Sequence, residues 1–553
     1  MKPKTWLQGR HAAAYKWAQG LVLGIAAISP LMAADWPLFG QNLANTSDAA
    51  SETAISTKTA ASLKTKWTFT TAGDVSARAA VVNGVAYFPD WGGNIWAVDT
   101  ASGKAIWSHQ ISDYGLPAGT FSRTSPALAN GMLYIGTSYV GQASSTTPPT
   151  GWLLAIDAAK GGLVWMMQPN TSNPIPVITS SPAVAAGVVY VGMTSYEEIA
   201  AINPDYPCCS ARGSVVAVNA LSGSKLWETF TVPTGYTGGG VWSSNPAVDL
   251  TRGTVFVDTG NNYSVPTDPA YVECISNGGT NAGCQSPDDH TDSILALDTS
   301  TGQVKWATRF QNWDQMQSEG FTNGSDDFNL SCAPEDAFKT RGYNPPGVGN
   351  CPNGYGPDYD FGNAPSEITY STGTGSKTII GAGQKSGIYY ALDPDTGAEL
   401  WRTQVGPGSS LGGMEWGSAS DGKRIYVAIG NVYGIAYAAG RAGSWSALDP
   451  ATGAILWQIA DPNTALDIGP MTVANGVVYA ASMGGLVSKT AKTMFALDAS
   501  TGATLWSFVA GSAVNAGASI VDGVVYWGSG YSVLGTVLGS GNSKFYAFSL
   551  NGD

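Results

Sequence analysis

Histidine is nearly absent from this sequence, which has three in 553 residues. His11 lies close to the first residue, so His109 and His290 are all that the rest of the chain offers. So few imidazoles argue against a histidine-rich zinc or copper site. They also argue against Ser-His-Asp catalysis, in which an imidazole is the base. The sequence has no Cys-x-x-Cys-His, which excludes a covalently attached c-type haem.

Basic side chains are also scarce. The chain has 27 Lys and Arg against 40 Asp and Glu, for a formal net charge of −13. Leaving out the four basic residues of 1–34 gives −17 for residues 35–553. Such a charge disfavours binding to nucleic acid, whose phosphates are negative, and would attract a basic partner at low salt.

No apolar run reaches the roughly 20 residues that cross a bilayer. The longest candidate, 21–28, follows four basic residues and precedes Ala33 and Ala34, an order typical of a secretory signal. We predict that 1–34 is a signal peptide and that the remainder is exported to the periplasm. No Cys follows the cleavage region, so we expect no lipid or membrane anchor.

What the sequence does contain is an eleven-residue repeat, Ala-x-Asp-x-x-x-Gly-x-x-x-Trp. Asn219 replaces the Asp in the third copy. Repetition at this scale indicates an architecture built from stacked units. The seven copies are at 97–107, 155–165, 217–227, 296–306, 391–401, 447–457 and 496–506.

Each copy predicts the same local structure. An apolar strand ends at the Asp, the Asp and Gly turn the chain, and the Trp lies in the next strand. Upstream signatures such as 182–192 predict two more strands joined by a Gly turn. A four-stranded unit with two apolar faces must stack on its neighbours, and radial stacking gives a β-propeller.

Counting the tryptophans predicts eight blades. Trp67 precedes the seven repeats, and the chain ends in a strand at 544–550 that has no Trp after it. We therefore predict an all-β, eight-bladed propeller over 35–553, a single domain, in which strand 63–70 completes the C-terminal blade 519–550. This pairing hides the edges that an open sheet would expose. The long spacings before Trp306 and Trp401 place insertions in those two blades.

The six cysteines all lie between 208 and 351. Export permits disulfides, and proximity favours Cys274–Cys284 and Cys332–Cys351. Cys208 and Cys209 are adjacent. They are either unrelated thiols, or thiols bridged elsewhere, or a flat vicinal disulfide ring suited to lying against a planar ligand.

The tryptophan repeat in an exported eight-bladed ring resembles the tryptophan-docking motif of the quinoprotein alcohol dehydrogenases, which bind pyrroloquinoline quinone (PQQ). The resemblance covers nearly all of 35–553. Non-catalytic propellers that act as outer-membrane assembly scaffolds share the repeat, so a binding or scaffolding module in the cell envelope is the alternative. The candidate site residues decide between the two interpretations.

The resemblance implies a calcium site and a cofactor floor. Glu197 matches the family's calcium-ligating Glu, with Glu198 as the alternative, and Asn261 matches its calcium-ligating Asn. Trp242 matches the Trp beneath the quinone, although packing between blades is the ordinary role of a propeller Trp. Thr179 and Thr194 match residues that hold PQQ.

The catalytic residues implied by the resemblance are Asp360 and Lys385. Asp360 matches the general base of an Asp-x-Asp-Phe segment, with Asp358 nearby, and is also the third metal ligand. Lys385 matches the Lys or Arg that contacts the quinone oxygens, although a Lys in a turn is more often a solvated charge. The remaining cofactor-binding candidates are Cys208, Cys209, Arg212, Arg123, Glu415 and Trp416, with Arg78 as a further possible partner of the PQQ carboxylates.

Glu415 departs from the Asn that methanol-oxidising members carry before the Trp. The order Tyr-Glu-Glu, Pro-Cys-Cys and Arg-Gly-Ser over 196–214 looks most like the polyvinyl alcohol dehydrogenases. The resemblance therefore implies PQQ- and calcium-dependent oxidation of polyvinyl alcohol or other secondary alcohols. With no haem motif in the chain, it also implies a separate soluble cytochrome c as electron acceptor.

Overall fold

The Asp and Gly of the repeat form a tight turn. In the first copy, Asp99 Oδ1 accepts hydrogen bonds from the backbone N–H of Ser102 at 2.7 Å and from its hydroxyl at 2.6 Å. These bonds lower the pKa of Asp99. Gly103 has φ +66°, and a Cβ there would come within 2.6 Å of the Trp67 ring. Glycine is therefore required both by the backbone conformation and by the close indole.

Each repeat tryptophan docks onto the following blade. Its indole Nε1 donates to the backbone carbonyl of the residue after the motif's Asp or Asn, and Trp506 donates to Leu63 in the strand that closes the ring. Identical bonds thus join every blade to the next. The bonds are Trp67 to Thr100, Trp107 to Ala158, Trp165 to Ala220, Trp227 to Thr299, Trp306 to Pro394, Trp401 to Pro450, Trp457 to Ala499 and Trp506 to Leu63, at 2.9–3.1 Å.

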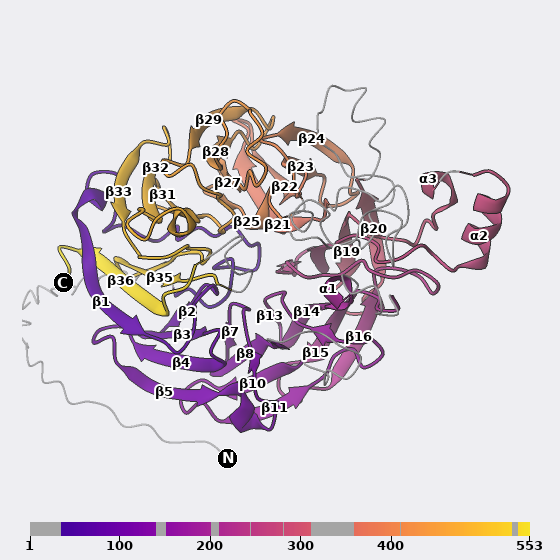
Figure 1. Ribbon diagram of the computed structural model, residues 1–553, viewed down its shortest axis with the longest axis horizontal. Helices are drawn as coiled ribbons and strands as arrows, with labels where there is room; N and C mark the ends of the chain where they lie inside the picture. Colours follow the sequence, from indigo (N-terminus) through magenta and orange to yellow (C-terminus); the bar gives the residue numbers. More distant parts are fainter. Residues whose placement is uncertain are drawn as a thin grey trace, which may run out of the picture. The chain divides into compact units, whose positions relative to one another are not determined.

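The computed structural model describes residues 35–139, 151–200, 209–243, 245–279, 281–310, 359–409, 411–532 and 540–553. Within the unit Ala33–Asp553, the strands form eight antiparallel blades around a ring, as predicted (Figure 1). Blades 1 to 4 consist of β2 (Ala80–Val82), β3 (Val85–Pro89), β4 (Asn94–Asp99) and β5 (Ala105–Gln110); β7 (Ala127–Ala129), β8 (Met132–Gly136), β10 (Leu153–Asp157) and β11 (Leu163–Met167); β13 (Ala183–Ala185), β14 (Val188–Ser195), β15 (Ser214–Asn219) and β16 (Lys225–Phe230); and β17 (Ala247–Asp249), β18 (Thr254–Asp258), β19 (Ser293–Asp298) and β20 (Val304–Arg309).

The remaining four blades follow the same order from the axis outward. They consist of β21 (Gly362–Ser371), β22 (Ser376–Gly383), β23 (Ile388–Leu392) and β24 (Glu399–Gln404); β26 (Ala419–Ser420), β27 (Ile425–Ile429), β28 (Ser444–Leu448) and β29 (Ile455–Ala460); β30 (Thr472–Ala474), β31 (Val477–Ala481), β32 (Met494–Asp498) and β33 (Thr504–Phe508); and β34 (Ser519–Val521), β35 (Val524–Ser529), β36 (Lys544–Leu550) and β1 (Leu63–Thr70).

The ring closes as the sequence predicts. β1 pairs antiparallel with β36, from Leu63 opposite Leu550 to Thr70 opposite Lys544. The first and last strands of the propeller therefore share blade 8, and neither leaves an unpaired inner edge.

Several short elements lie outside the blades, in the connections between strands. β6 (Thr120–Phe121) pairs with β9 (Ser138–Tyr139), β12 (Pro176–Val177) extends β14, and β25 (Glu415–Gly417) runs parallel to β21. The helix α2 (Pro269–Ser276) projects from the ring with α3 (Asn281–Cys284), and the predicted disulfide Cys274–Cys284 joins them (Figure 1). The other short elements are α1 (Glu197–Ala200) and the 3₁₀ turns η1 (Ala60–Ser62), η2 (Ile111–Tyr114) and η3 (Gly484–Leu486). No helix in the described ranges is both long and apolar enough to span a membrane.

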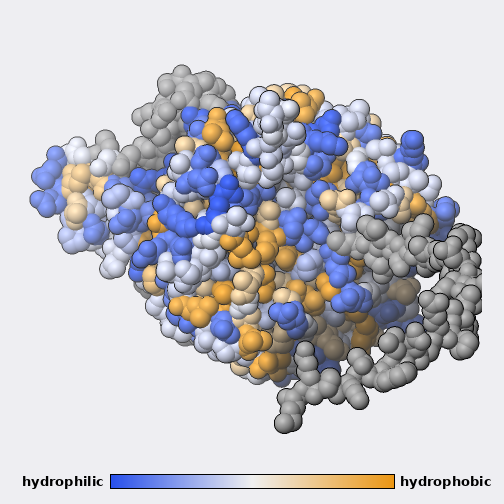
Figure 2. Space-filling model, turned by 180° about the vertical axis from the view of Figure 1, so that it is seen from behind, coloured by the Kyte–Doolittle hydropathy of each residue, from blue (hydrophilic) through white to orange (hydrophobic). Residues whose placement is uncertain are grey.

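The core lies between the blades. The inner strands are buried almost throughout, whereas the outermost strands are mainly exposed and contribute their tryptophan as the part-buried contact. The face seen in Figure 2 carries hydrophilic and apolar side chains, and the apolar ones gather over its middle and lower part. Stacking of apolar blade faces is the main stabilising force in such a fold.

A segment that we call the belt, residues 36–49, follows the inner strands of the ring. Its carbonyl groups accept hydrogen bonds from the N–H groups of residues in six blades. The belt thus satisfies backbone groups that the short inner strands leave unpaired. The pairs are Val81 to Trp36, Leu128 to Pro37, Val248 to Leu43, Glu367 to Ala44, Ser420 to Thr46 and Val473 to Ser47, at 2.7–3.0 Å.

The longer connections lie at the end of the channel opposite the belt. In an antiparallel blade, the connection between the second and third strands lies at the same end of the ring as the connection that leads to the next blade. The belt lies beside the turns at the other end, where Asp35 accepts from the N–H of Asn83. Side chains just before the inner strands therefore meet among the long connections, where binding residues are usually found.

Candidate active site

Asp360 lies just before β21 and is 2% exposed. Its Oδ2 accepts hydrogen bonds from Trp242 Nε1 at 2.8 Å and from Lys385 Nζ at 3.2 Å. Its Oδ1 accepts from the backbone N–H of Asn261 at 2.9 Å. Four candidates that lie up to 143 positions apart in the sequence are therefore in direct contact.

Lys385 is the cation of this cluster. It occupies the turn between β22 and β23, and 7% of it is exposed. Its Nζ lies 5.1 Å from the centroid of the Trp242 ring, and its backbone N–H donates to the carbonyl of Asp360 at 2.9 Å. A charge this well buried requires a partner, and here a carboxylate and an indole face provide it. Lys385 is therefore not a solvated surface charge.

Glycine makes room for the carboxylate. A Cβ on Gly260 would lie 2.9 Å from Oδ2 of Asp360 and 3.0 Å from its Cγ. Asn261, the next residue, is 1% exposed. The Thr-Gly-Asn sequence thus allows Asp360 to reach the Asn261 backbone, because any larger residue at 260 would push the two apart.

Glu197 is the first residue of α1 and is 1% exposed. Its Oε2 accepts from the N–H groups of Ser210 at 2.8 Å and Ala211 at 2.6 Å. A carboxylate held by two backbone donors is fixed in orientation. The alternative, Glu198, lies in the same helix, but its side chain is outside what the structure describes.

The end of β14, near Glu197, adjoins the loop of Asn261. The hydroxyls of Thr194 and Tyr263 lie 3.1 Å apart, and the Tyr263 hydroxyl donates to the carbonyl of Ser195 at 3.4 Å. The predicted ligands Glu197 and Asn261 therefore come from adjoining segments. Among the described residues there is no group of three or more His, Cys, Asp and Glu that could hold a metal. The protein alone thus offers two carboxylates and an amide.

Trp242 has two contacts besides those with Asp360 and Lys385. Thr179 Oγ1 donates to the Trp242 carbonyl at 2.6 Å. The Trp416 ring meets it edge to face, with the ring centroids 5.6 Å apart. The two indoles form a corner rather than an ordinary contact between stacked blades.

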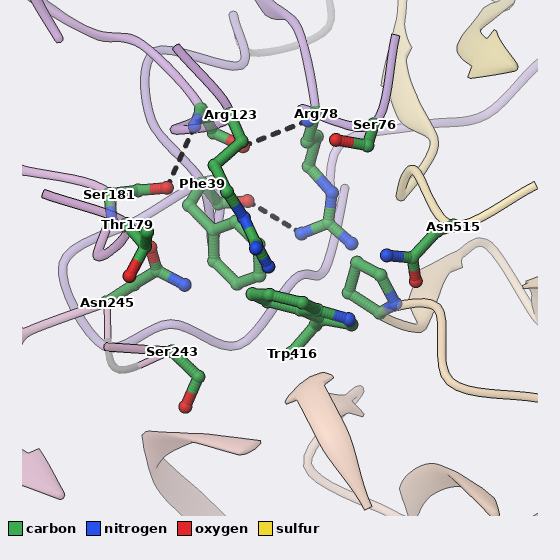
Figure 3. A pocket seen from close by; sticks show the side chains of 12 residues that line it. Phe39, Ser76, Arg78, Arg123, Thr179, Ser181, Ser243, Asn245, Trp416 and Asn515 are labelled. Atoms are coloured by element: carbon green, nitrogen blue, oxygen red, sulfur yellow. Dashed lines mark hydrogen bonds between the residues drawn. The ribbon is translucent and has the colours of Figure 1, made fainter. Parts of the chain in front are cut away.

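Trp416 has an unusual backbone. Its φ is +65°, a conformation that bulky residues rarely adopt and that often marks a functional site. The guanidinium of Arg123 lies over its ring at 4.2 Å (Figure 3). Within the described ranges its buried Nε1 has no hydrogen-bond partner, so an indole donor remains available at the site.

Glu415 precedes Trp416 in β25 and is 8% exposed. β25 pairs with β21, which places Glu415 opposite Gly362, two residues after Asp360. Burial raises the pKa of Glu415 to about 7, against the lowering influence of Lys385 and Arg123. The site thus contains a carboxyl that is protonated over much of the acidic range.

Two arginines make their hydrogen bonds away from Asp360, although Arg78 also lines the cavity described next. Arg212 stacks over Phe230 at 4.1 Å and donates to the Val232 carbonyl, so its described contacts are in blade 3 and the connection after it. Arg78 is fully buried and donates to Phe39 in the belt at 2.6 Å. Burial lowers the pKa of Arg78 to about 9. Arg78 is therefore not a surface charge but a link between the belt and the ring.

A polar cavity of about 30 Å³ is lined by Trp416 and by Phe39 of the belt. Its wall contains residues that the sequence interpretation missed, among them Ser125, and Ser181 and Asn245 (Figure 3). Each accepts a backbone N–H from the preceding blade, at 2.8–2.9 Å. Each also directly precedes a proline, and this recurring polar-Pro pair is the signal that could have identified them.

Several predictions lie outside the described residues: Cys208, Asp358 and the pair Cys332–Cys351. Cys209 is disulfide-bonded. Its partner is also outside, because the two other described cysteines bond to each other. The vicinal ring therefore stays a prediction.

Comparison with known proteins adds to this geometry. A protein-family model for PQQ-type repeats, described as outer membrane protein assembly factor BamB, matches residues 16–205 and 384–545. The match covers well over half of the chain. The unmatched segment, 206–383, carries Trp242, Asn261 and Asp360.

Similar proteins resemble the chain over most of its length. A polyvinylalcohol dehydrogenase of Pseudomonas sp. is 29% identical over 89% of this chain and 73% of its own. One from Sphingopyxis sp. (strain 113P3) is 28% identical over 85% and 68%. The quinohemoprotein alcohol dehydrogenase of Comamonas testosteroni shares the fold, with a TM-score of 0.64 at 19% identity over 94% of this chain and 81% of its own. The repeats, the relatives and the eight-bladed ring agree, and the chain belongs to the PQQ-dependent (quinoprotein) alcohol dehydrogenase family.

Proposed function

We propose that this protein oxidises secondary alcohols, including polyvinyl alcohol, with PQQ and calcium, and that it works in the periplasm with a separate soluble cytochrome c as electron acceptor. The observation that carries the proposal is the Asp360 carboxylate, buried and oriented by Trp242, Asn261 and Lys385. A buried base in contact with a cation suits the removal of a proton and a hydride from an alcohol.

The donor set fits calcium. Glu197 and Asp360 supply carboxylate oxygens and Asn261 an amide oxygen, all hard ligands of the kind that calcium prefers. Calcium takes six to eight oxygens, so three side chains leave positions for oxygens from a bound cofactor. Gly260 supports the fit, because it lets Asp360 approach the Asn261 segment.

The surroundings also fit a flat, anionic cofactor. Trp242 would be its floor, held by Thr179, and Thr194 lies at the adjoining strand end. Arg123 would attract its carboxylates, and the unpartnered Nε1 of Trp416 could donate to it. Cys208 and Cys209, if they form a vicinal ring, would cover the opposite face. Arg212 is the weakest member of this set, because its described contacts lie with Val232 and Phe230.

The protein's part in the reaction follows from these positions. Asp360 would accept the hydroxyl proton of the alcohol, with the Trp242 indole and the Asn261 N–H holding the carboxylate in place. Lys385 would balance negative charge that develops beside it. When bound, PQQ supplies an electrophilic carbonyl that accepts hydride, and calcium supplies Lewis-acid polarisation. Glu415, when protonated, could donate a hydrogen bond at the same site.

The test is dye-linked oxidation by purified PQQ-free protein, with and without PQQ plus Ca²⁺. Polyvinyl alcohol and simple secondary alcohols are the substrates. We expect activity only when both additions are present. If no alcohol is oxidised under any of these conditions, the catalytic proposal fails.

A scaffolding role is the second candidate, because the matching family model is described as an assembly factor. That match leaves out 206–383, where most of the proposed site lies. Binding of PQQ to the protein, measured by quenching of tryptophan fluorescence, separates the two functions, because a scaffold has no reason to bind it.

A further inference from the structure

Two buried carboxylates between blades 6 and 7 have no opposite charge beside them. Asp461 follows β29 and Asp467 precedes β30, and they are 2% and 0% exposed. Among the residues that the structure describes, no Lys, Arg or His forms an ion pair with either. Buried charges are normally paired or bound to a metal, because isolation from water strongly disfavours them.

The oxygens of this pair are also short of hydrogen bonds. Among the described residues, no N–H or O–H group donates to either carboxylate oxygen of Asp467 or to Oδ2 of Asp461. The same holds for the hydroxyl of Ser444, which is 0% exposed and begins β28. Buried polar atoms in folded proteins are nearly always satisfied, so four unsatisfied oxygens in one neighbourhood need an explanation.

Gly443 brings these groups together. Its carbonyl accepts the backbone N–H of Asp461 at 2.9 Å, and a Cβ on it would lie 2.8 Å from Oδ2 of Asp467. Ser444 is the next residue. The missing side chain at 443 therefore lets the Asp467 carboxylate come close to the start of β28.

The electrostatics agree with this placement. Burial, and after it the charge of Asp461, raises the pKa of Asp467 well above its usual value. Burial raises the pKa of Tyr437 to about 12, and the charge of Asp467 adds to it. Two acids and a phenol thus face one another with no base among them.

We propose that Asp461, Asp467 and Ser444 bind a calcium ion, at a site separate from the one proposed at Glu197, Asn261 and Asp360. Two carboxylates neutralise a divalent cation, and carboxylate and hydroxyl oxygens are ligands of the hard type. Backbone carbonyls and water complete its coordination. A proton shared between the two acids is the competing arrangement, because their side chains lie within hydrogen-bonding distance of each other. That arrangement needs no metal ion, so calcium bound to the purified protein separates the two. The ion links blade 6 to blade 7.

The test measures bound calcium in the full-length protein purified without added PQQ, by elemental analysis after gel filtration. Wild type and Asp467→Asn are compared. We expect Asp467→Asn to lose one calcium per chain. Asp360→Asn is the matched control, because it alters the other proposed site and should keep this calcium. Equal calcium in wild type and Asp467→Asn overturns the proposal.

Thermal unfolding gives a second readout. Chelation by EDTA should lower the Tm of wild type and of Asp360→Asn by more than that of Asp467→Asn, which can lose calcium only from the other proposed site. If Asp467→Asn does not fold, Ser444→Ala replaces it, because that change removes only one ligand. We expect Ser444→Ala to need roughly tenfold more calcium for the same rise in Tm. An identical calcium dependence in Ser444→Ala and wild type, or a wild-type Tm that ignores both EDTA and calcium, contradicts the site. Neither result bears on alcohol oxidation.

Discussion

Asp360 and Asp467 are equally buried acids, and the fold treats them in opposite ways. Asp360 receives three hydrogen bonds, one of them from the Lys385 ammonium. Asp467 receives none at its carboxylate from any N–H or O–H group of the described residues and faces a second acid instead. Both oxygens of the Asp360 carboxylate accept hydrogen bonds from the protein. Neither oxygen of Asp467 has such a donor among the described residues.

The difference shows how a structure separates a group held ready for chemistry from a group that awaits a ligand. Around Asp360 the donors come from two blades, so the carboxylate is oriented before any substrate arrives. Around Asp467 the nearest charged group is a second acid, and two buried carboxylates without a base favour a cation. The following changes test both halves of this comparison, from the largest expected effect to the smallest.

Asp360→Asn should reduce the rate of alcohol oxidation most. The amide keeps the shape and can still accept from Trp242, but it cannot take a proton. Because general-base catalysis typically contributes roughly 10²- to 10⁴-fold, we expect a fall in kcat of that size. Dye-linked turnover with PQQ and Ca²⁺ measures it. Full turnover in this variant would remove Asp360 as the base and leave the enzyme class untouched.

Lys385→Met should destabilise the fold, because it leaves Asp360 buried without its cation. Breaking a buried pair from one side typically costs about 3–5 kcal/mol. The measurement is the free energy of unfolding from urea denaturation. Lys385→Arg, which keeps the charge, is the matched control and should lose much less. A loss in Lys385→Met no greater than in the control would mean that Asp360 does not depend on this charge.

Glu415→Gln should change how stability depends on pH. Burial raises the pKa of Glu415 to about 7 in the folded protein, against an ordinary value of 4.5 for a glutamate carboxyl. The stabilising contribution is therefore complete below pH 4.5 and is lost as the pH rises through about 7. Relative to Glu415→Gln, wild type should lose ~3 kcal/mol of unfolding free energy over this range. Glu273→Gln, on the exposed surface of α2, should follow wild type, and parallel profiles for wild type and Glu415→Gln would contradict the shift.

Arg252→Met should have the smallest effect. Arg252 bonds Asp249, Glu367 and Asp395 at 2.6–2.9 Å, but its side chain is 30% exposed and solvent screens its charge. We expect a loss of about 1 kcal/mol that shrinks at high salt. Urea denaturation at two salt concentrations measures it. If Arg252→Met loses as much unfolding free energy as Lys385→Met, burial does not explain the difference between Arg252 and Lys385.

The eight-bladed ring could be predicted from the sequence because each blade uses the same local interactions. The Asp and Gly of the motif act within one turn, and the Trp reaches only the adjacent blade, so their pattern survives in the order of residues. The shared eighth blade followed from one leftover Trp and one leftover strand. In contrast, nothing periodic marks the belt, because each of its residues meets a different blade.

Only part of the candidate site could be predicted from the sequence. Residues such as Asp360 and Lys385 were found through family likeness, but their mutual contact depends on the three-dimensional ring. Asp461 and Asp467 look like ordinary loop residues in the sequence, since their isolation from any base is a property of packing. The contact of Arg78 with the belt could not be predicted either, because the sequence shows only a single basic residue before a strand.

The pairing of β1 with β36 has a consequence for how the protein reaches its native state. These partners are separated by more than 470 residues, so the two ends of the ring must find each other after nearly every intervening blade has been synthesised. Contacts that distant form late and slowly. Until then blade 8 exposes a bare edge to any neighbouring chain. Chaperones that shield that edge during maturation should therefore matter more for the yield of this protein than any single residue in its interior.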